Sequence, residues 1–485
     1  MYEPGSILDR SSDPAMREPT PAEMEADRAA SVAAGAFTSW SSLPPHTRAD
    51  HLHAGAAALD ADREALVELT ALEVGAARSW TEFNVDLSIE ILQQAATLCD
   101  HLGDRPAPTD ETSILRLQPA GVVLGIAPWN APLVLAVRAI AAPLACGNTV
   151  VMKASEHCPK THSRIIERIA AAGLPEGAAN VVTNAPEQSE AVVERLIAHP
   201  AIRRVNFTGS TRVGRDVAIT AARYLKPCLL ELSGKPAMIV LEDADFDRAI
   251  DAAVFGAFFN QGQICMATER IIVVAEIADR FVDALVARTA KLRAADPKVE
   301  TADLGSLINA AAAERVTAMI EDAVRKGAVL RCGGEVNGAV MQPAVVDRVS
   351  SAMRLYHEES FGPVASILRV RDDIEALSIA NDSDYGLTAA VFSADERRAK
   401  MFADKLETGI VQINGTTVHD NPDMPFGGMK DSGYGRFGGS HAIQEFTELR
   451  WIANRGHAAI PQLHLKDRVN RSASATKPTA TGGNP

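Results

Sequence analysis

The 485-residue chain is predicted to be an α/β protein built on two parallel β-sheets. From about residue 113 to 232, short apolar strand candidates alternate with amphipathic helix candidates, a pattern typical of a parallel sheet covered by helices. The same alternation begins again near residue 236. A chain of this length is also too long for one ordinary hydrophobic core. We therefore expect two α/β domains with a break near Gly234 and Lys235.

The first half of the chain divides into a helical part and an alternating part. Residues 21–100 are rich in alanine and are predicted to be mostly helical. A pair of strands is expected within 113–130, leading into a Pro-Trp turn. The elements that follow are expected to be helix 133–147, strand 148–155, helix 161–174, strand 180–184, helix 189–200 and strand 203–210.

The second half repeats the strand and helix pattern. A strand is expected at 237–242 and a helix at 243–260, where apolar residues recur at a spacing of four. The later elements are expected to be strand 269–276, helix 313–327, strand 365–370 and strand 389–395.

Composition argues against several classes of protein. The formal net charge of −14 disfavours nucleic acid as a main partner, because nucleic-acid binders usually present a basic face. The start of the sequence lacks the pattern of a signal peptide, and no apolar run is long enough to span a membrane. The six cysteines contain no CxxC pair, which disfavours a disulfide framework or a zinc site. We expect a cytoplasmic protein with reduced thiols, no bound metal, and disordered ends at 1–20 and 466–485.

One cysteine, Cys265, lies in the joint between a helix candidate and a strand candidate, in the segment NQGQIC (260–265). A thiol kept for packing would be expected inside one of those elements. Gly262 permits a sharp backbone turn, so the thiol can face a cleft. Cys265 is therefore a candidate nucleophile, and a packed thiol is the alternative.

A nucleophile of this kind needs a base and a donor for an oxyanion. Glu231 ends a short apolar run, where a partly buried carboxylate would have a raised pKa and could act as a general base. An ion pair with Lys235 is the alternative. Asn130 lies between two prolines that fix its backbone, so its amide has a defined direction and can hydrogen-bond an oxyanion. An ordinary turn asparagine is the alternative.

Two strand ends carry features of a dinucleotide site. Gly209, Ser210 and Gly214 follow a strand and open a helix, whose first backbone N–H groups can hold a pyrophosphate. Lys153 and Glu156 follow another strand, and a carboxylate there accepts hydrogen bonds from ribose hydroxyls and repels a 2′-phosphate. This pattern favours NAD over NADP, and a solvated pair of charges is the alternative.

Eight stretches, taken together, resemble the aldehyde dehydrogenase superfamily. They occur in the family's order and cover about 110–455. The stretches are PWNAP (128–132), GNTVVMKASE (147–156), FTGSTRVG (207–214), LELSGK (230–235), NQGQIC (260–265), EESFGPV (358–364), NDSDYGLTAAVFS (381–393) and PFGGMKDSGYGR (425–436).

The resemblance implies the aldehyde-dehydrogenase fold. Its parts are expected to be a Rossmann-like NAD domain (21–97 and 118–232), an α/β catalytic domain (233–435) and a small β bridging element (98–117 and 440–465). In this family the bridging element joins copies of the chain, so a homodimer or homotetramer is expected.

The resemblance also implies a reaction, in which NAD or NADP oxidises an aldehyde through a thiohemiacetal and a thioester on the nucleophile. Cys265 matches the nucleophile, Glu231 the general base and Asn130 the oxyanion amide. The implied cofactor contacts are Ile126, Pro128, Trp129, Lys153, Glu156, Gly209, Ser210, Gly214, Leu232, Glu359 and Phe361. Ser233 departs from the family pattern, which usually has glycine there, and we expect a small change in backbone freedom without loss of activity.

A finer resemblance links the chain to the salicylaldehyde and vanillin dehydrogenase branch, which acts on aromatic aldehydes. It is carried by GQICMATER (262–270), VRAIAAPLACGN (137–148), TVHDNPDMPFGG (417–428) and EFTELRWI (445–452). The implied substrate is an aldehyde of the salicylaldehyde, vanillin or benzaldehyde type. The expected pocket residues are Arg138, Val134, Ile264, Met266 and Phe426.

Arg138 follows Asn130 by two helical turns and is expected to point toward the substrate tunnel. A guanidinium there can bond a ring hydroxyl or a carboxylate, or stack on an arene. A salt bridge between the domains is the alternative.

Other functions stay open at this point. The substrate can be an aliphatic aldehyde or a semialdehyde. An acylating dehydrogenase would pass the thioester to coenzyme A, and the presence of Glu231 disfavours it. A non-enzymatic binding protein on the same fold is disfavoured by the joint presence of Cys265, Glu231 and Asn130.

Overall fold

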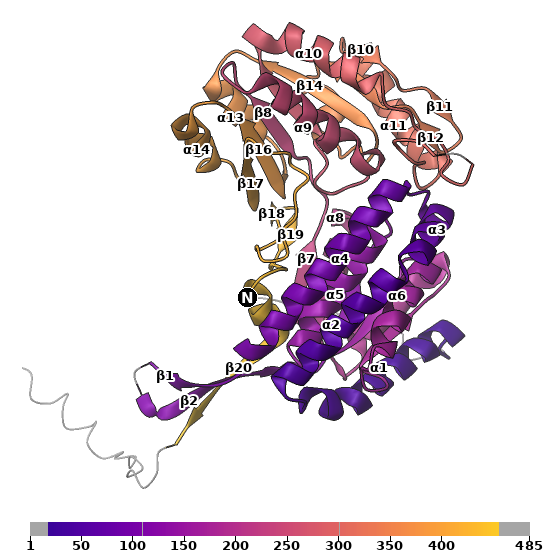
Figure 1. The fold of residues 1–485 in the computed structure, drawn as a ribbon, viewed down its shortest axis with the longest axis vertical. Helices are drawn as coiled ribbons and strands as arrows, with labels where there is room; N and C mark the ends of the chain where they lie inside the picture. Colours follow the sequence, from indigo (N-terminus) through magenta and orange to yellow (C-terminus); the bar gives the residue numbers. More distant parts are fainter. Residues whose placement is uncertain (1–17, 109, 300, 455–485) are drawn as a thin grey trace, which may run out of the picture. The chain divides into compact units, whose positions relative to one another are not determined.

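The computed structural model describes residues 18–108, 110–299 and 301–454. They form two compact units, the larger made of 18–103 and 117–448 and the smaller of 104–116 and 449–454. Of the ends predicted to be disordered, 1–17 and 466–485 lie outside the described residues. The larger unit contains two large sheets, and Figure 1 labels some strands of each.

Four helices precede the first large sheet, as predicted for 21–100. They are α1 (Pro21–Ser41), α2 (Pro45–Ala61), α3 (Arg63–Val74) and α4 (Arg78–Leu98), followed by the short helix η3 (Cys99–His101). A capping box starts α1, in which the side chains of Thr20 and Glu23 each accept a hydrogen bond from the other's backbone N–H. Alanine favours the helical state, and its small side chain lets neighbouring helices such as α2 and α4 pack closely.

The first large sheet has six strands in the order β19-β7-β6-β3-β4-β5. They are β3 (Val122–Ile126), β4 (Thr149–Lys153), β5 (Ala179–Val182), β6 (Ile202–Thr208), β7 (Cys228–Glu231) and β19 (Gly433–Tyr434). All neighbours pair in parallel except β19, which is antiparallel to β7. The connecting helices are α5 (Pro132–Ala145), α6 (Pro159–Ala171), η4 (Pro186–Gln188), α7 (Ser189–Ala198) and α8 (Thr211–Arg223). The predicted alternation of strand and helix is confirmed.

The strand order of this sheet reverses at β3. β4 and β5 lie on one side of β3, and β6 and β7 lie on the other. In open α/β sheets, ligands bind outside the carboxyl ends of the strands at such a reversal. The strands end here at Ile126, Lys153 and Thr208, so a ligand site is expected beside these three residues.

The second large sheet has seven strands in the order β10-β13-β14-β9-β8-β16-β17, parallel except for β10. They are β8 (Ala237–Val240), β9 (Arg270–Val274), β10 (Val329–Cys332), β13 (Ala344–Asp347), β14 (Val364–Val370), β16 (Thr388–Phe392) and β17 (Ile410–Ile413). The chain passes from the first sheet to this one between Glu231 and Ala237.

Helices cover both faces of the second sheet because successive strand residues point to opposite sides. Met238 and Ile271 pack in a hydrophobic cluster with α9 (Phe246–Phe258) and α10 (Ala275–Thr289). Ile239 and Ile272 pack in the cluster on the opposite face. The helices that contribute to that second cluster are α11 (Ala310–Arg325), α12 (Arg354–His357), α13 (Asp373–Asn381) and α14 (Glu396–Ala403).

Smaller elements complete the chain. Two short ribbons pair β11 (Val336–Asn337) with β12 (Val340–Met341), and β15 (Tyr385–Gly386) with β18 (Met429–Lys430). Near the C-terminus, α15 (His441–Phe446) leads into β20 (Thr447–Ala453), which forms a three-stranded sheet with β1 (Gly103–Ala107) and β2 (Asp110–Pro119). The predicted domain boundaries, and a role of this sheet in joining copies of the chain, stay predictions.

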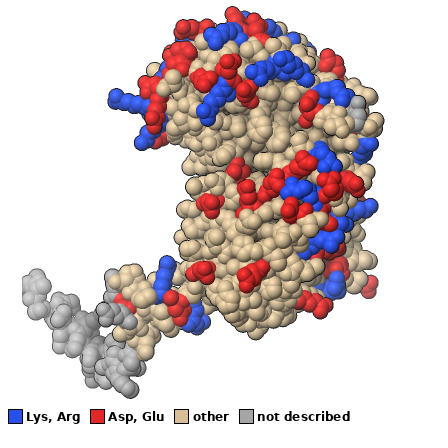
Figure 2. All heavy atoms as spheres, viewed as in Figure 1, with Lys and Arg blue, Asp and Glu red and all other residues tan. Residues whose placement is uncertain are grey.

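Charged side chains, helix length and cysteine pairing describe the chemistry of the surface and the thiols. On the face drawn in Figure 2, acidic and basic side chains of the described residues are interspersed, and no continuous basic area is visible. No helix among the described residues has the length and apolarity needed to cross a membrane. All six cysteines are free thiols.

Candidate active site

Glu231 is the last residue of β7 and is almost completely buried, with 1% of its surface exposed. Neither carboxylate oxygen accepts a hydrogen bond from a nitrogen or oxygen donor of the described residues. Burial raises the pKa of Glu231 to about 7, against smaller lowering effects of the Cys265 thiol and the Arg138 charge. The group can therefore gain and lose a proton near neutral pH, as a general base must.

Lys235 is engaged elsewhere, so the alternative interpretation of Glu231, an ion pair with Lys235, is wrong. Lys235 Nζ donates to Glu269 Oε2 at 2.7 Å and to the Glu358 carbonyl at 2.7 Å. Glu269 also accepts from the backbone N–H groups of Ser360 and Phe361. The Lys235–Glu269 pair thus fixes the backbone that carries Glu359 and Phe361.

Cys265 follows a sharply bent stretch of backbone. After α9, residues 259–262 form the short helix η5, in which Asn260, Gln261 and Gly262 all have positive φ, of 49°, 56° and 69°. Such conformations are costly for non-glycine residues and persist only where the surroundings impose them. A Cβ on Gly262 would lie 2.2 Å from the Gly362 carbonyl oxygen, so only glycine fits there.

The Cys265 thiol lies close enough to Glu231 for each group to shift the pKa of the other. Burial, and next the neighbouring Glu231 carboxyl group, raise the pKa of the thiol well above its usual value. The resting side chain is therefore the protonated thiol. A Cβ on Gly234 would lie 2.5 Å from the Cys265 carbonyl oxygen, so glycine at this position lets the two loops approach closely.

Asn130 is buried and is tied to the same loop. Its side-chain Nδ2 donates to the Gln263 carbonyl at 3.0 Å, which fixes the amide plane and leaves the second N–H hydrogen for another acceptor. Its own carbonyl accepts from Trp80 Nε1 at 3.0 Å and from Asn260 Nδ2 at 2.9 Å. The amide is thus held rigidly beside the backbone that leads into Cys265.

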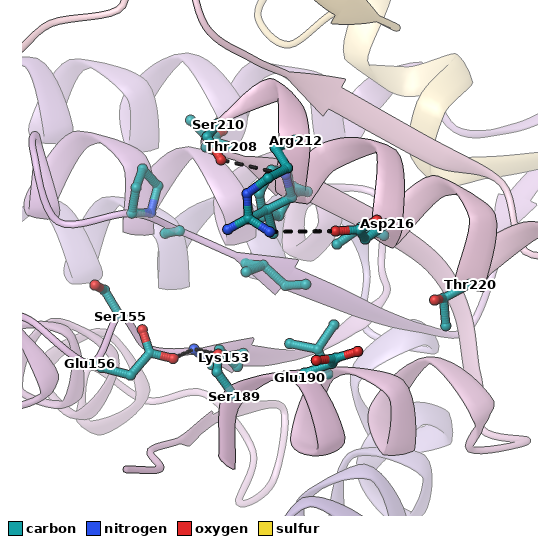
Figure 3. Close-up of a pocket in the computed structure, with 18 of the residues that line it drawn as sticks. Lys153, Ser155, Glu156, Ser189, Glu190, Thr208, Ser210, Arg212, Asp216 and Thr220 are labelled. Atoms are coloured by element: carbon teal, nitrogen blue, oxygen red, sulfur yellow. Dashed lines mark hydrogen bonds and ion pairs between the residues drawn. The ribbon is translucent and has the colours of Figure 1, made fainter. Parts of the chain in front are cut away.

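A cavity of about 650 Å³ opens at the carboxyl ends of β3, β4 and β6, where the strand order reverses. Of the predicted cofactor contacts, those that line it are Ile126, Pro128, Trp129, Lys153, Glu156, Gly209 and Ser210. In Figure 3, Lys153, Glu156 and Ser189 gather on one side of the cavity, and Ser210, Arg212 and Asp216 lie on the other.

Lys153 and Glu156 form an ion pair at the edge of this cavity. The Lys153 ammonium is buried and also donates to Ser189 Oγ at 2.9 Å, so the alternative interpretation, a solvated pair of charges, is wrong. Asn184 Nδ2 donates to Glu156 Oε1 at 3.2 Å. Burial acts to raise the pKa of Glu156, but its hydrogen bonds to Lys153 and Ser189 outweigh this, so the pKa is lowered and the carboxylate is charged.

The opposite wall is the N-terminal end of α8. The Ser210 side chain caps the helix by accepting from the Val213 N–H. A Cβ on Gly209 would meet the Phe207 ring at 2.5 Å, and one on Gly214 would meet the Leu232 side chain at 2.3 Å. Gly214 and Leu232 therefore pack against each other and do not line the cavity.

Glu359 and Phe361 lie near the candidate catalytic residues and not on the wall of the large cavity. Glu359 Oε1 accepts from the Gly234 N–H at 3.0 Å, and the Ser233 hydroxyl also bonds to this carboxyl group. Burial raises the pKa of Glu359 to about 7. The Phe361 ring packs edge-on against Trp129, with ring centroids 5.8 Å apart. Trp129 thus connects Phe361 to the cavity that it lines.

The predicted substrate-pocket residues fall into two groups. The apolar residues Val134, Ile264, Met266 and Phe426 belong to one buried cluster, against which the Cys265 side chain also packs. Arg138 is buried, lies 4.2 Å above the centre of the Phe426 ring, and forms an ion pair with Asp420. The salt bridge considered for Arg138 therefore exists, with Asp420 as its partner.

Several residues that shape the site were not predicted. Asn260 and Asp420 are noted only as parts of the segments NQGQIC (260–265) and TVHDNPDMPFGG (417–428), and Trp80 is given no role. The signals were weak: Trp80 lies in a helix far from the other motifs, and Asp420 lies in a polar loop. Only the folded chain brings them to Asn130 and Arg138.

Comparison with known proteins gives one consistent result. The model of the aldehyde dehydrogenase family matches residues 11–452. A vanillin dehydrogenase from Pseudomonas fluorescens is 52% identical over 431 residues, which cover 88% of this chain and 89% of that protein.

Solved structures agree with the sequence matches. The crystal structure of a salicylaldehyde dehydrogenase from Pseudomonas putida G7, complexed with salicylaldehyde, has a TM-score of 0.89 and 43% identity, covering 91% of this chain and 92% of that one. A betaine aldehyde dehydrogenase from Staphylococcus aureus in complex with NAD⁺ has a TM-score of 0.85 and 33% identity, covering 91% and 88%.

Proposed function

The chain belongs to the aldehyde dehydrogenase family, and from this premise we propose that it oxidises an aromatic aldehyde to the carboxylic acid with NAD. The observation that carries the proposal is that the Cys265 thiol and the buried Glu231 carboxyl group lie close enough to act on each other, beside an amide of Asn130 that keeps one free N–H hydrogen. A nucleophile, a base and an oxyanion donor are the groups that oxidation through a thioester needs.

In the first step, Cys265 becomes the nucleophile. Because the pKa of its thiol is raised and that of Glu231 is near neutral, Glu231 is the acceptor for the thiol proton. The thiolate attacks the aldehyde carbon, a C–S bond forms, and the carbonyl oxygen becomes an oxyanion. The second N–H of Asn130 and the backbone N–H of Cys265 stabilise that charge.

The second half of the reaction turns the thiohemiacetal into product. A nicotinamide cofactor, whose nicotinamide half Glu359 and Phe361 would hold, would supply the hydride acceptor that turns the thiohemiacetal on Cys265 into a thioester. Glu231 then releases the thiol proton to solvent and takes a proton from a water molecule that attacks the thioester. The C–S bond breaks, the carboxylic acid is released, and the sulfur recovers its proton.

The residues around the large cavity suit NAD. Its volume of about 650 Å³ and its place at the strand reversal suit one half of a dinucleotide, and the first N–H groups of α8, at the cavity wall, would hold the pyrophosphate. Glu156 is charged at the cavity edge, where it would accept from ribose hydroxyls and repel a 2′-phosphate. Gly209 and Ser210 would hold the phosphates, and Glu359 and Phe361 the nicotinamide half.

Replacing Glu156 with glutamine is expected to weaken the preference for NAD. The amide keeps a hydrogen-bond acceptor but no longer repels a phosphate, so the ratio of kcat/KM for NAD to that for NADP should fall by about 10-fold. Steady-state rates with both cofactors measure this ratio. A Glu190→Gln variant removes an exposed carboxylate from the same cavity and should keep the ratio. An unchanged ratio in Glu156→Gln would refute the assignment.

The substrate side favours an aromatic aldehyde over a carboxylated semialdehyde. Asp420 already neutralises Arg138, so a substrate carboxylate would find no free cation there and would meet a second negative charge. The neighbouring side chains Phe426, Ile264 and Met266 are apolar and suit a ring.

A panel of aldehydes tests the proposed function. The purified enzyme with NAD should give kcat/KM values for benzaldehyde, salicylaldehyde and vanillin at least ~10-fold above those for a short aliphatic aldehyde or succinate semialdehyde, since a ring buries more apolar surface. NADH absorbance gives the rates. The reverse order would contradict the aromatic assignment. Acceleration by coenzyme A, with an acyl-coenzyme A product, would instead establish the acylating reaction.

A further inference from the structure

The ion pair between Arg138 and Asp420 lies close to the candidate catalytic residues but has no part in the reaction steps above. Arg138 belongs to α5, and Asp420 belongs to the loop after β17. Both are buried, with side chains 7% and 5% exposed. The charges of both residues act on Glu231, and that of Arg138 acts on Cys265. The pair is therefore within electrostatic reach of the reacting atoms.

Only one of the two Asp420 carboxylate oxygens accepts a hydrogen bond within the described residues. Oδ2 accepts a hydrogen bond from Arg138, whereas Oδ1 is buried and accepts none from the described residues. A buried carboxylate oxygen without a donor is energetically costly, so native proteins rarely leave one unmatched. Oδ1 therefore requires a donor from outside the described chain.

A small cavity lies at this position. It has a volume of about 20 Å³ and is lined by Arg138, Asp420 and Phe426, together with Ile91, Asn421 and Met424 among others. A space of this size admits one water molecule or one hydroxyl group, and nothing as large as a ring. The Phe426 ring and Ile91 provide apolar walls, so an arene can lie beside the cavity while a substituent enters it.

Resting on the proposed function, we propose that Asp420 Oδ1 accepts a hydrogen bond from a phenolic hydroxyl group of the substrate, so that Asp420 selects hydroxylated aromatic aldehydes. A phenol is a strong neutral donor, and its bond to a carboxylate is charge-assisted. A methoxy group at the same ring position cannot donate, and a carboxylate is repelled. Arg138 positions Asp420 by holding Oδ2 and by lying over Phe426.

The test compares each hydroxybenzaldehyde isomer with the methoxybenzaldehyde of the same substitution. In the wild-type enzyme, at least one isomer should show a hydroxyl-to-methoxy ratio of kcat/KM of ~10 or more. Asp420→Asn should lower that ratio by ~5-fold or more, because a neutral amide oxygen is a weaker acceptor. The ratio does not depend on the fraction of enzyme that is folded.

A double variant provides a second test in case the single variant Asp420→Asn does not fold. Arg138→Leu with Asp420→Leu removes both buried charges together, so neither is left unpaired, and should bring the ratio close to 1. Asp423→Asn is the matched control, because it removes an exposed carboxylate from the same loop outside the cavity, and it should keep the wild-type ratio.

Two failures can be told apart. If no aromatic aldehyde is oxidised, the proposed function itself is wrong. If benzaldehyde is oxidised but the hydroxyl-to-methoxy ratio is the same in the wild-type enzyme and in both Asp420 variants, the function stands and the role of Asp420 is overturned. A wild-type ratio near 1 for every isomer overturns it as well.

Discussion

Replacing Cys265 with alanine is expected to lower aldehyde oxidation by at least ~10⁴-fold while NAD still binds. Without sulfur no covalent thiohemiacetal forms, and removing the nucleophile of a catalytic set costs nearly the whole of its rate enhancement. The large cavity does not include Cys265 among its lining residues, so the substitution leaves the proposed adenine and phosphate contacts in place. NADH formation measures the rate, and calorimetric titration measures NAD binding.

Two controls sharpen this result. Cys332→Ala removes another half-buried free thiol, from an edge strand of the seven-stranded sheet, and should keep near-normal turnover. Cys265→Ser keeps the size of the side chain but has a much weaker nucleophile, so it should resemble Cys265→Ala. Near-normal turnover in Cys265→Ala would exclude the nucleophile assignment.

Structural features that depend on short stretches of the chain could be predicted from the sequence. The predicted alternation of strand and helix in both halves agrees with the structure. It could be predicted because the spacing of apolar residues and the apolar content are properties of short segments. Cys265 could be recognised as unusual for the same reason: it lies in neither neighbouring element. The raised pKa of Glu231 also follows from a local pattern, a carboxylate at the end of an apolar strand.

Partnerships between distant residues could not be predicted. Lys235 is four residues from Glu231, yet it pairs with Glu269, since Glu231 ends β7 in one sheet while Lys235 leads into the other. Arg138 and Asp420 are separated by 282 positions, and Trp80 and Asn130 by 50. Each pairing depends on how sheets and loops meet in the folded chain.

The backbone before Cys265 is a further case. Gly262 alone allowed a turn to be predicted, but the positive φ angles of Asn260 and Gln261 were not foreseen. Their side chains supply the compensation. Asn260 Nδ2 donates to Asn130, while the Gln261 side chain donates to the Ser306 carbonyl and accepts from the Gly305 N–H. The unfavourable conformation is thus maintained by contacts that also align Asn130 with the cysteine loop.

Glu231→Gln is expected to separate the two halves of the reaction. The amide cannot take a proton from water, so thioester hydrolysis should slow by ~10²–10⁴-fold. It cannot take the thiol proton either, but solvent can replace it in that role, so the first turnover should still release NADH as a burst, at a reduced rate. In the wild-type enzyme, hydrolysis should become faster as pH rises through about 7, because only the deprotonated carboxyl group acts as a base and the pKa of Glu231 is about 7. Glu231→Gln should lack this pH dependence. Rapid-mixing absorbance and mass spectrometry of the acylated enzyme measure both steps.

Glu359→Gln tests whether the hydrolysis role belongs to Glu231 alone. Glu359 is the other buried carboxyl group of the site with a pKa of about 7. It bonds to Gly234 and not to the cysteine, and its proposed role is to hold the nicotinamide half of the cofactor. Its loss should therefore slow the burst and raise KM for NAD, without accumulation of thioester. Two carboxyl groups with similar pKa values would then differ in the step they control, because Glu231 acts more strongly than Glu359 on the Cys265 thiol. A lost burst with unimpaired hydrolysis in Glu231→Gln would contradict its role as the base.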